Sequence, residues 1–202
     1  MAIASANRIK AALIALMLGF ALVATLVQAA FAEDVRRLAI HNSVEISRCE
    51  RFVAAEEFSV GRLIGERTLG SVSFNFAKFF LSEAIETDVQ VLTLQAWILR
   101  YSADDASLIK RLGGEEWVVL PLCSIRHLME MGSNGGSNIE ERSNFAYARS
   151  PVDGRLMAIH WLVNHDNEWV IGAVEVPHPH LDWAAGSRVF SRATVEATHN
   201  LR

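Results

Sequence analysis

The sequence has little of the positive charge that marks a nucleic-acid-binding protein. Among its 202 residues, 19 are lysine or arginine and 23 are aspartate or glutamate, so the formal net charge is −4. No lysine- or arginine-rich run is present, so the chain lacks the charge pattern that binds phosphate backbones or anionic lipid surfaces. We therefore expect no nucleic acid among its partners.

The motifs that hold catalytic nucleophiles, phosphates and redox cofactors are also missing. The sequence contains no G-x-S-x-G, no G-x-x-x-x-G-K-[ST], no C-x-x-C and no C-x-x-C-H. Acid pairs such as Glu56 and Glu57 are adjacent, and adjacent side chains on a helix or strand point apart, so they do not face one scissile bond. These absences favour a protein that is not an enzyme and that carries no organic cofactor.

Cysteine is scarce, with only Cys49 and Cys123 in the chain. In an oxidising compartment, a lone pair of cysteines predicts a disulfide. That bond would close a loop of about 75 residues and stabilise the fold by roughly 4–5 kcal/mol. The alternative is that Cys123, which follows the apolar run WVVLPL, is a buried small hydrophobic residue.

The long hydrophobic run lies at the N-terminus. Residues 11–32 are uncharged, Arg8 and Lys10 precede them, and the run ends in Ala30-Phe31-Ala32. A basic start, an apolar centre and an A-x-A end are typical of a secretory signal peptide. The alternative is an uncleaved anchor, because about 20 apolar residues can span a bilayer.

This pattern divides the chain into two parts. We expect residues 1–32 to be a signal peptide and residues 33–202 to be a single exported α+β domain. No second run in residues 33–202 is long enough to span a membrane. The predicted location is the periplasm or the extracellular space.

The N-terminal half of the domain has mostly helical patterns. Phe76, Phe79 and Phe80 recur at helical spacing, Asp104 and Asp105 open a capping-box-like segment, and Gly113-Gly114 would end it. Residues 89–101 fit both a helix and a strand, and we favour the helix. The pattern predicts helices within residues 47–65, 72–86, 89–101, 102–112 and 124–131, with a short strand at 115–122.

The C-terminal half has mostly strand patterns. Runs at 144–149, 155–163 and 168–176 are joined by the turn Pro151 to Gly154 and by a second polar turn, which predicts an antiparallel meander. The predicted fold class is therefore α+β, in which helices mainly from the N-terminal half cover one face of an antiparallel sheet built mainly from the C-terminal half.

The segment that follows the last of these strands is rich in histidine. In His178-Pro179-His180 the prolines favour an extended chain, so both imidazoles point roughly the same way. With Asp182 as a third ligand, they could hold Zn²⁺ or Cu²⁺. The alternative is an exit segment that leaves the sheet and packs Trp183 against it.

Three tryptophans are candidates for a binding surface. If the polar turn pairs Val163 with Glu168, then Trp161 and Trp169 lie on opposite faces of the sheet and His160 is half-buried. One of these two tryptophans would face the core, and the other a helix layer, a groove or a partner. Trp161, Trp169 and Trp183 are the predicted binding residues, with core packing as the alternative.

The sequence as a whole favours a small exported binding or accessory domain that acts on a protein partner or a small apolar ligand. An envelope metal-binding protein or metal-dependent enzyme that uses His178 and His180 is the first alternative. A purely structural envelope component is the second. The sequence identifies neither the partner nor the ligand.

Overall fold

The computed structural model describes residues 38–133, 143–178 and 182–193. The predicted signal peptide therefore lies outside the described residues. Within these residues, no helix combines the length and the apolar composition needed to cross a membrane.

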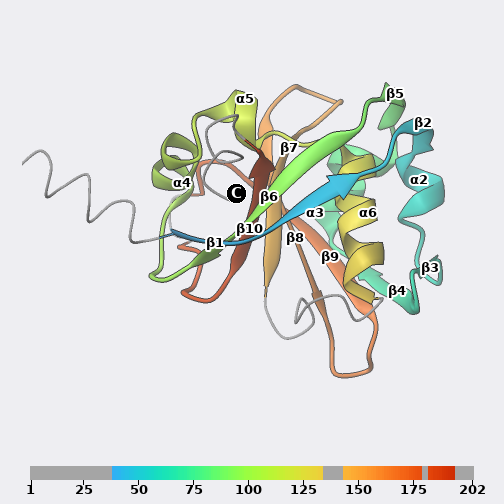
Figure 1. Ribbon diagram of the computed structural model, residues 1–202. Helices are drawn as coiled ribbons and strands as arrows, with labels where there is room; N and C mark the ends of the chain where they lie inside the picture. Colours follow the sequence, from blue (N-terminus) through green and yellow to red (C-terminus); the bar gives the residue numbers. More distant parts are fainter. Residues whose placement is uncertain (1–37, 134–142, 179–181, 194–202) are drawn as a thin grey trace, which may run out of the picture. The chain divides into compact units, whose positions relative to one another are not determined.

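Eight strands form one sheet in the order β1-β6-β10-β7-β8-β9-β4-β3 (Figure 1). The β7–β8, β8–β9, β6–β10 and β3–β4 pairs are antiparallel, whereas the β7–β10 and β4–β9 pairs are parallel. A separate two-stranded antiparallel ribbon pairs β2 with β5. The ten strands are β1 (Leu38–Ile46), β2 (Cys49–Val53), β3 (Leu63–Ile64), β4 (Arg67–Val72), β5 (Ile85–Val89), β6 (Leu92–Leu99), β7 (Asn144–Arg149), β8 (Leu156–Val163), β9 (Trp169–Glu175) and β10 (Arg188–Arg192).

Short helices lie on both faces of this sheet. Alternate residues of a strand point to opposite faces, and in β7 Ala146 and Ala148 share one core with Ile125 of α6, whereas the Tyr147 hydroxyl donates a hydrogen bond to Asp105 of α4. The helices are α2 (Ala54–Glu57), α3 (Phe74–Phe76), the π-helix η1 (Ala77–Leu81), α4 (Asp105–Arg111), α5 (Glu115–Val118) and α6 (Leu122–Ser133).

The predicted fold class is wrong. The N-terminal half supplies the six strands β1 to β6, the sheet is mixed, and the helices do not cover one face. The segment favoured as a helix at 89–101 contains β6, which pairs with β10 from Arg188↔Ile98 to Arg192↔Leu94. Periodicity alone does not separate a short buried strand from a helix, so this distant pairing decides the outcome.

Sequence patterns among neighbouring residues predicted two parts of the fold correctly. The predicted three-stranded meander is confirmed as β7, β8 and β9. Helix α4 begins after Asp104, whose side chain accepts a hydrogen bond from the Ser107 backbone N–H, and it is followed by Gly113 and Gly114 at positive φ. The strand predicted at 115–122 is wrong, since it contains helix α5 and the start of α6.

The register of the β8–β9 hairpin differs from the prediction by one residue. Val163 pairs with Trp169, and His160 pairs with Gly172. The Asn164 side chain accepts hydrogen bonds from the backbone N–H groups of Asp166 and Glu168, so Glu168 belongs to the loop. A one-residue shift moves a side chain to the other face, which places Trp169 on the same face as Trp161.

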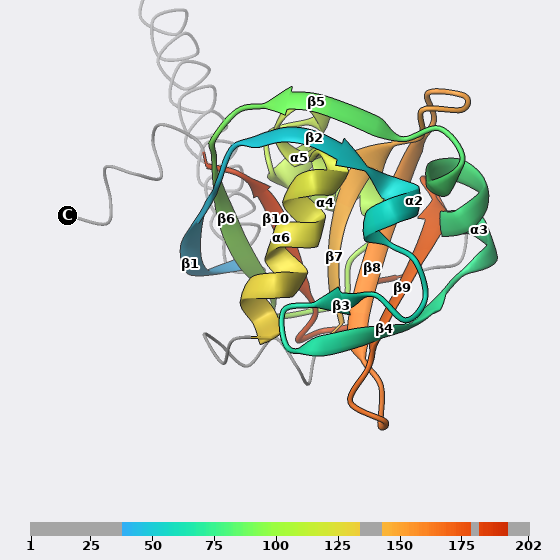
Figure 2. The same cartoon turned by 90° about the vertical axis from the view of Figure 1, so that its right-hand side faces the viewer.

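The predicted disulfide between Cys49 and Cys123 is confirmed, with a Cα–Cα distance of 6.6 Å. It joins the start of β2 to the first turn of α6. Figure 2 shows β2 and β5 passing over one end of α6, so the bond ties the two-stranded ribbon to this helix. A disulfide is consistent with the oxidising location that the N-terminal segment predicts.

Candidate functional site

The structure does not show the predicted metal ligands as a group. His178 and Asp182 are both exposed, and His180 lies outside the described residues. In the part of the chain that is described, no group of three or more histidine, cysteine, aspartate or glutamate side chains could hold a metal ion. The metal site therefore stays a prediction.

The three candidate tryptophans are buried. Trp161 and Trp169 have no exposed surface, and both belong to the core between the sheet and α6. Trp183 stacks on Phe145 at 3.9 Å between ring centroids, and its Nε1 donates a hydrogen bond of 2.8 Å to Asp105. The segment after the prolines thus returns to the sheet through Trp183, as the alternative prediction stated.

His160 is half-buried on the sheet, as the sequence predicts. Its imidazole fills the space over Gly172 on the neighbouring strand, where a Cβ atom would overlap with it. Burial lowers the pKa of His160 below its ordinary value, because the positive form loses hydration. Among the described residues, His160 belongs to no group of three or more potential metal ligands.

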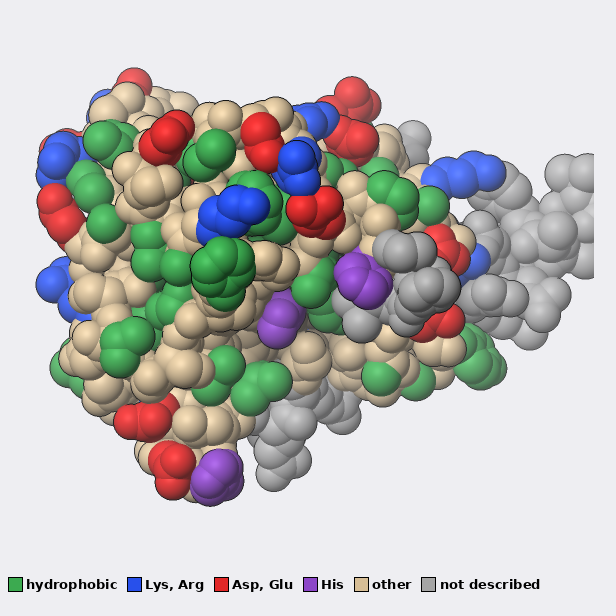
Figure 3. Space-filling model, turned by 180° about the vertical axis from the view of Figure 1, so that it is seen from behind, with side chains coloured by type: hydrophobic (Ala, Val, Ile, Leu, Met, Phe, Trp, Pro, Cys, Tyr) green, Lys and Arg blue, Asp and Glu red, His purple; other side chains and the backbone are tan. Residues whose placement is uncertain are grey.

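Exposed hydrophobic side chains do not point to one docking surface. The face shown in Figure 3 has hydrophobic side chains mixed with acidic and basic ones. The large exposed hydrophobic residues of the described chain come from separate loops, strands and helices: Val60, Leu63, Phe74, Ile85, Val91, Tyr101, Met131 and Val152. Scattered residues of this kind are normal on a protein surface.

A pocket of about 200 Å³ opens between β2 and α6. Helix α6 lines the pocket with residues 123, 126, 127 and 130, which have the spacing of one helix face. The opposite wall comes from β2 and the residues just before it. The lining residues are Ser47, Arg48, Cys49, Arg51, Phe52, Glu57, Cys123, Arg126, His127 and Glu130.

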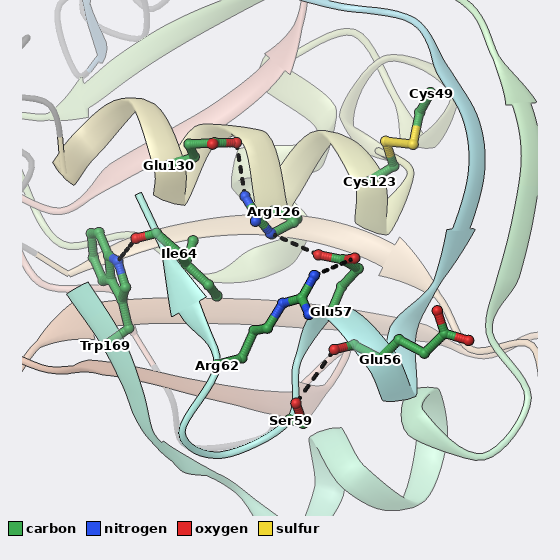
Figure 4. A network of polar contacts seen from close by, with 10 residues as sticks. All are labelled: Cys49, Glu56, Glu57, Ser59, Arg62, Ile64, Cys123, Arg126, Glu130 and Trp169. Carbon is green, nitrogen blue, oxygen red and sulfur yellow. Dashed lines mark hydrogen bonds and ion pairs between the residues drawn. A yellow bond between two sulfur atoms is a disulfide. The ribbon is translucent and has the colours of Figure 1, made fainter. Parts of the chain in front are cut away.

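A chain of alternating charges runs along one side of this pocket (Figure 4). Arg62 Nη2 lies 3.1 Å from Glu57 Oε1, and Arg126 Nε lies 3.2 Å from Glu57 Oε2. Arg126 Nη1 then donates to Glu130 Oε2 at 2.8 Å. The Arg126 side chain is only 16% exposed, so the two carboxylates fix its guanidinium group in place.

Two further arginines lie at the pocket and are far more exposed. The side chain of Arg48 is 55% exposed and forms an ion pair with Asp88. The side chain of Arg51 is 64% exposed, and its ion pair with Glu56 has an N–O distance of 3.9 Å, beyond hydrogen-bond length. The guanidinium group of Arg51 therefore keeps donors that a bound anion could use.

The helix wall of the pocket is anchored from behind by Glu86 of β5. Its two carboxylate oxygens accept hydrogen bonds from the backbone N–H groups of Leu122, at 2.7 Å, and Cys123, at 2.9 Å. Burial raises the pKa of Glu86 above its ordinary value of 4.5, although these two hydrogen bonds act in the opposite direction. This side chain satisfies N–H groups that a helix start would otherwise leave unpaired.

The raised pKa of Glu86 gives a testable pH dependence. Just above pH 4.5 the folded state binds this proton more tightly than the unfolded state, so its contribution to stability falls as pH rises. We expect Glu86→Gln to lower the free energy of unfolding by about 1–2 kcal/mol at low pH, because one hydrogen bond is lost. That deficit should shrink as pH rises through this window, because glutamine does not titrate. Urea unfolding of both proteins across the window measures this, and a constant deficit would contradict it.

Sequence reasoning identified only the two cysteines of this pocket. Arg126, His127 and Glu130 have the spacing of one helix face within residues 124–131. Nothing in the sequence, however, placed β2 opposite this face. Comparison with protein-family models, with curated protein sequences and with solved structures gives no match for this chain.

Proposed function

We propose that this protein is a small exported binding domain that holds the anionic group of a small ligand in the pocket between β2 and α6. The observation that carries the proposal is Arg51, an exposed guanidinium group beside the pocket with no carboxylate at hydrogen-bond distance. Guanidinium groups bind carboxylate and phosphate through paired N–H donors.

The charge of the pocket supports this ligand class. Three arginines and two glutamates line it, so the lining is net positive by one charge without the histidine, in a chain whose net charge is −4. Because Arg126 is already paired with Glu57 and Glu130, and Arg48 with Asp88, Arg51 is the arginine of the lining that keeps donors for an incoming anion. A positive pocket on an acidic protein concentrates anions locally.

The volume of the pocket limits the size of the ligand. At about 200 Å³ it is smaller than the roughly 300–1,000 Å³ of pockets that enclose drug-sized molecules. A carboxylate or phosphate with a short body matches this volume. The apolar ligand expected from the sequence has less support, because charged side chains make up half of the lining residues.

Titration with simple anions tests the proposal. Sodium acetate and inorganic phosphate, added separately at constant ionic strength, should shift backbone NMR signals of β2 and α6 in a saturable way. Whichever anion binds more tightly identifies carboxylate or phosphate as the preferred group. We expect Arg51→Ala to weaken this binding about tenfold, since a charge-assisted hydrogen bond contributes about 1.5–3 kcal/mol.

Arg155→Ala is the matched control. Arg155 is an exposed arginine paired with Glu175 and Asp153, and it does not line the pocket. Its replacement should leave anion binding unchanged. The proposal fails if neither anion gives saturable shifts at the pocket, or if both arginine variants weaken binding equally.

A further inference from the structure

The disulfide lies at the edge of the core, where it also forms part of the pocket wall. Cys49 is partly exposed, and Cys123 is 8% exposed. Both cysteines line the same pocket as Arg48, Arg51 and Arg126. Figure 4 shows the disulfide at the end of the helix that carries Arg126. Small thiols reach a disulfide from its solvent-accessible side, which here is the side of the partly exposed Cys49.

We infer that the Cys49–Cys123 disulfide is a site of thiol–disulfide exchange with small thiols that carry an anionic group. This inference rests on the proposed function, because the pocket must attract the anionic group of the thiol. It adds a covalent reaction and a substrate class to that function. The attacking species is a thiolate, so positive charge beside the disulfide attracts the nucleophile as well as its acidic group.

The reaction balances in two steps. The thiolate sulfur attacks Cys49 Sγ, a new disulfide forms between them, and the Cys49–Cys123 bond breaks with its electron pair on Cys123 Sγ. A second thiolate then attacks the sulfur of the first thiol, which releases the small disulfide and leaves Cys49 as a thiolate. Two thiols are oxidised to one disulfide, and their two protons are taken up by the two cysteines.

The exposure of the two sulfur-bearing residues gives the direction of attack. Cys49 is the more accessible residue, so we expect the mixed disulfide to form there. The departing thiolate of Cys123 is one helical turn from Arg126, and a nearby cation stabilises a thiolate. The N-terminus of α6 adds little, because Glu86 already accepts the N–H groups of Leu122 and Cys123.

Three thiols of similar size and different charge test the inference. These are 2-mercaptoethanesulfonate, 2-mercaptoethanol and cysteamine, each applied to the native oxidised protein at the same thiolate concentration. Intact mass after acid quenching follows the mixed disulfide, and peptide mapping locates it. We expect the sulfonate to react about tenfold faster than cysteamine at low ionic strength, with Cys49 as the modified residue. This difference should decrease in high salt.

Two variants make the result specific to the pocket. Arg51→Ala should remove most of the preference for the sulfonate, whereas Arg155→Ala should leave it intact. Equal rates for the three thiols, modification of Cys123 instead of Cys49, or reaction only in denaturant would each overturn the inference. Acetate and phosphate titrations are read separately, so anion binding with an unreactive disulfide refutes the exchange reaction alone. Failure of both anions to bind refutes the proposed function.

Discussion

Replacement of both Cys49 and Cys123 by alanine is expected to lower the free energy of unfolding by about 4–5 kcal/mol. The disulfide joins residues 74 positions apart, so it removes much of the conformational entropy of the unfolded chain. Domains are typically stable by about 5–15 kcal/mol, so this loss is a large part of the total. The ribbon of β2 and β5 should be affected most, because two strands alone are marginally stable in water.

Urea unfolding measures this effect. The unfolding midpoint of the Cys49→Ala/Cys123→Ala variant should fall well below that of the oxidised protein. Wild-type protein in excess reductant is the matched control, because it also lacks the cross-link and should unfold near the variant. A variant as stable as the oxidised protein would show that the bond does not constrain the unfolded state.

Truncation of either core tryptophan is expected to be almost as costly. Trp161→Ala and Trp169→Ala should each lower the free energy of unfolding by about 3–5 kcal/mol, the cost of removing a large buried aromatic side chain. Both tryptophans are fully buried, and Trp161 stacks with Phe190 at 5.6 Å between ring centroids. Trp169 also donates a hydrogen bond of 3.3 Å from Nε1 to the Ile64 carbonyl.

This pair of variants tests the register of the β8–β9 hairpin. With Val163 opposite Trp169, both indoles face the same core, so both variants should be strongly destabilised. With the register shifted by one residue, Trp169 would lie on the other face and its replacement would cost much less. Trp117→Ala, at a partly exposed position in α5, is the control and should show a smaller loss by urea unfolding.

The features that sequence predicts well here depend on residues close together in the chain. Asp104 caps α4 through Ser107, three residues away, and Gly113 and Gly114 follow its end at positive φ. The β8–β9 register was missed because the Asn164 side chain captures two N–H groups and adds Glu168 to the loop. Such a loop has one residue more than the polar turn that its composition indicates.

Long-range pairing decides what the sequence does not predict. The apolar residues of β6 fit a strand because β10, about ninety positions later in the chain, pairs with them. The pocket has the same origin, since Arg51 and Arg126 belong to segments that only the folded chain brings together. The sequence predicted that the two cysteines pair, but it did not predict the pocket that surrounds them.

The position of β10 in the sheet determines when the full sheet can form. This strand comes last along the described chain, yet it lies between β6 and β7 and pairs with both. Until Arg188–Arg192 is available, β1 and β6 have no strand pairing with the strands from β7 to β3. A growing chain therefore has no continuous eight-stranded sheet until this strand is in place. The β10–β6 pairing joins residues about ninety or more positions apart, and contacts over such distances slow folding.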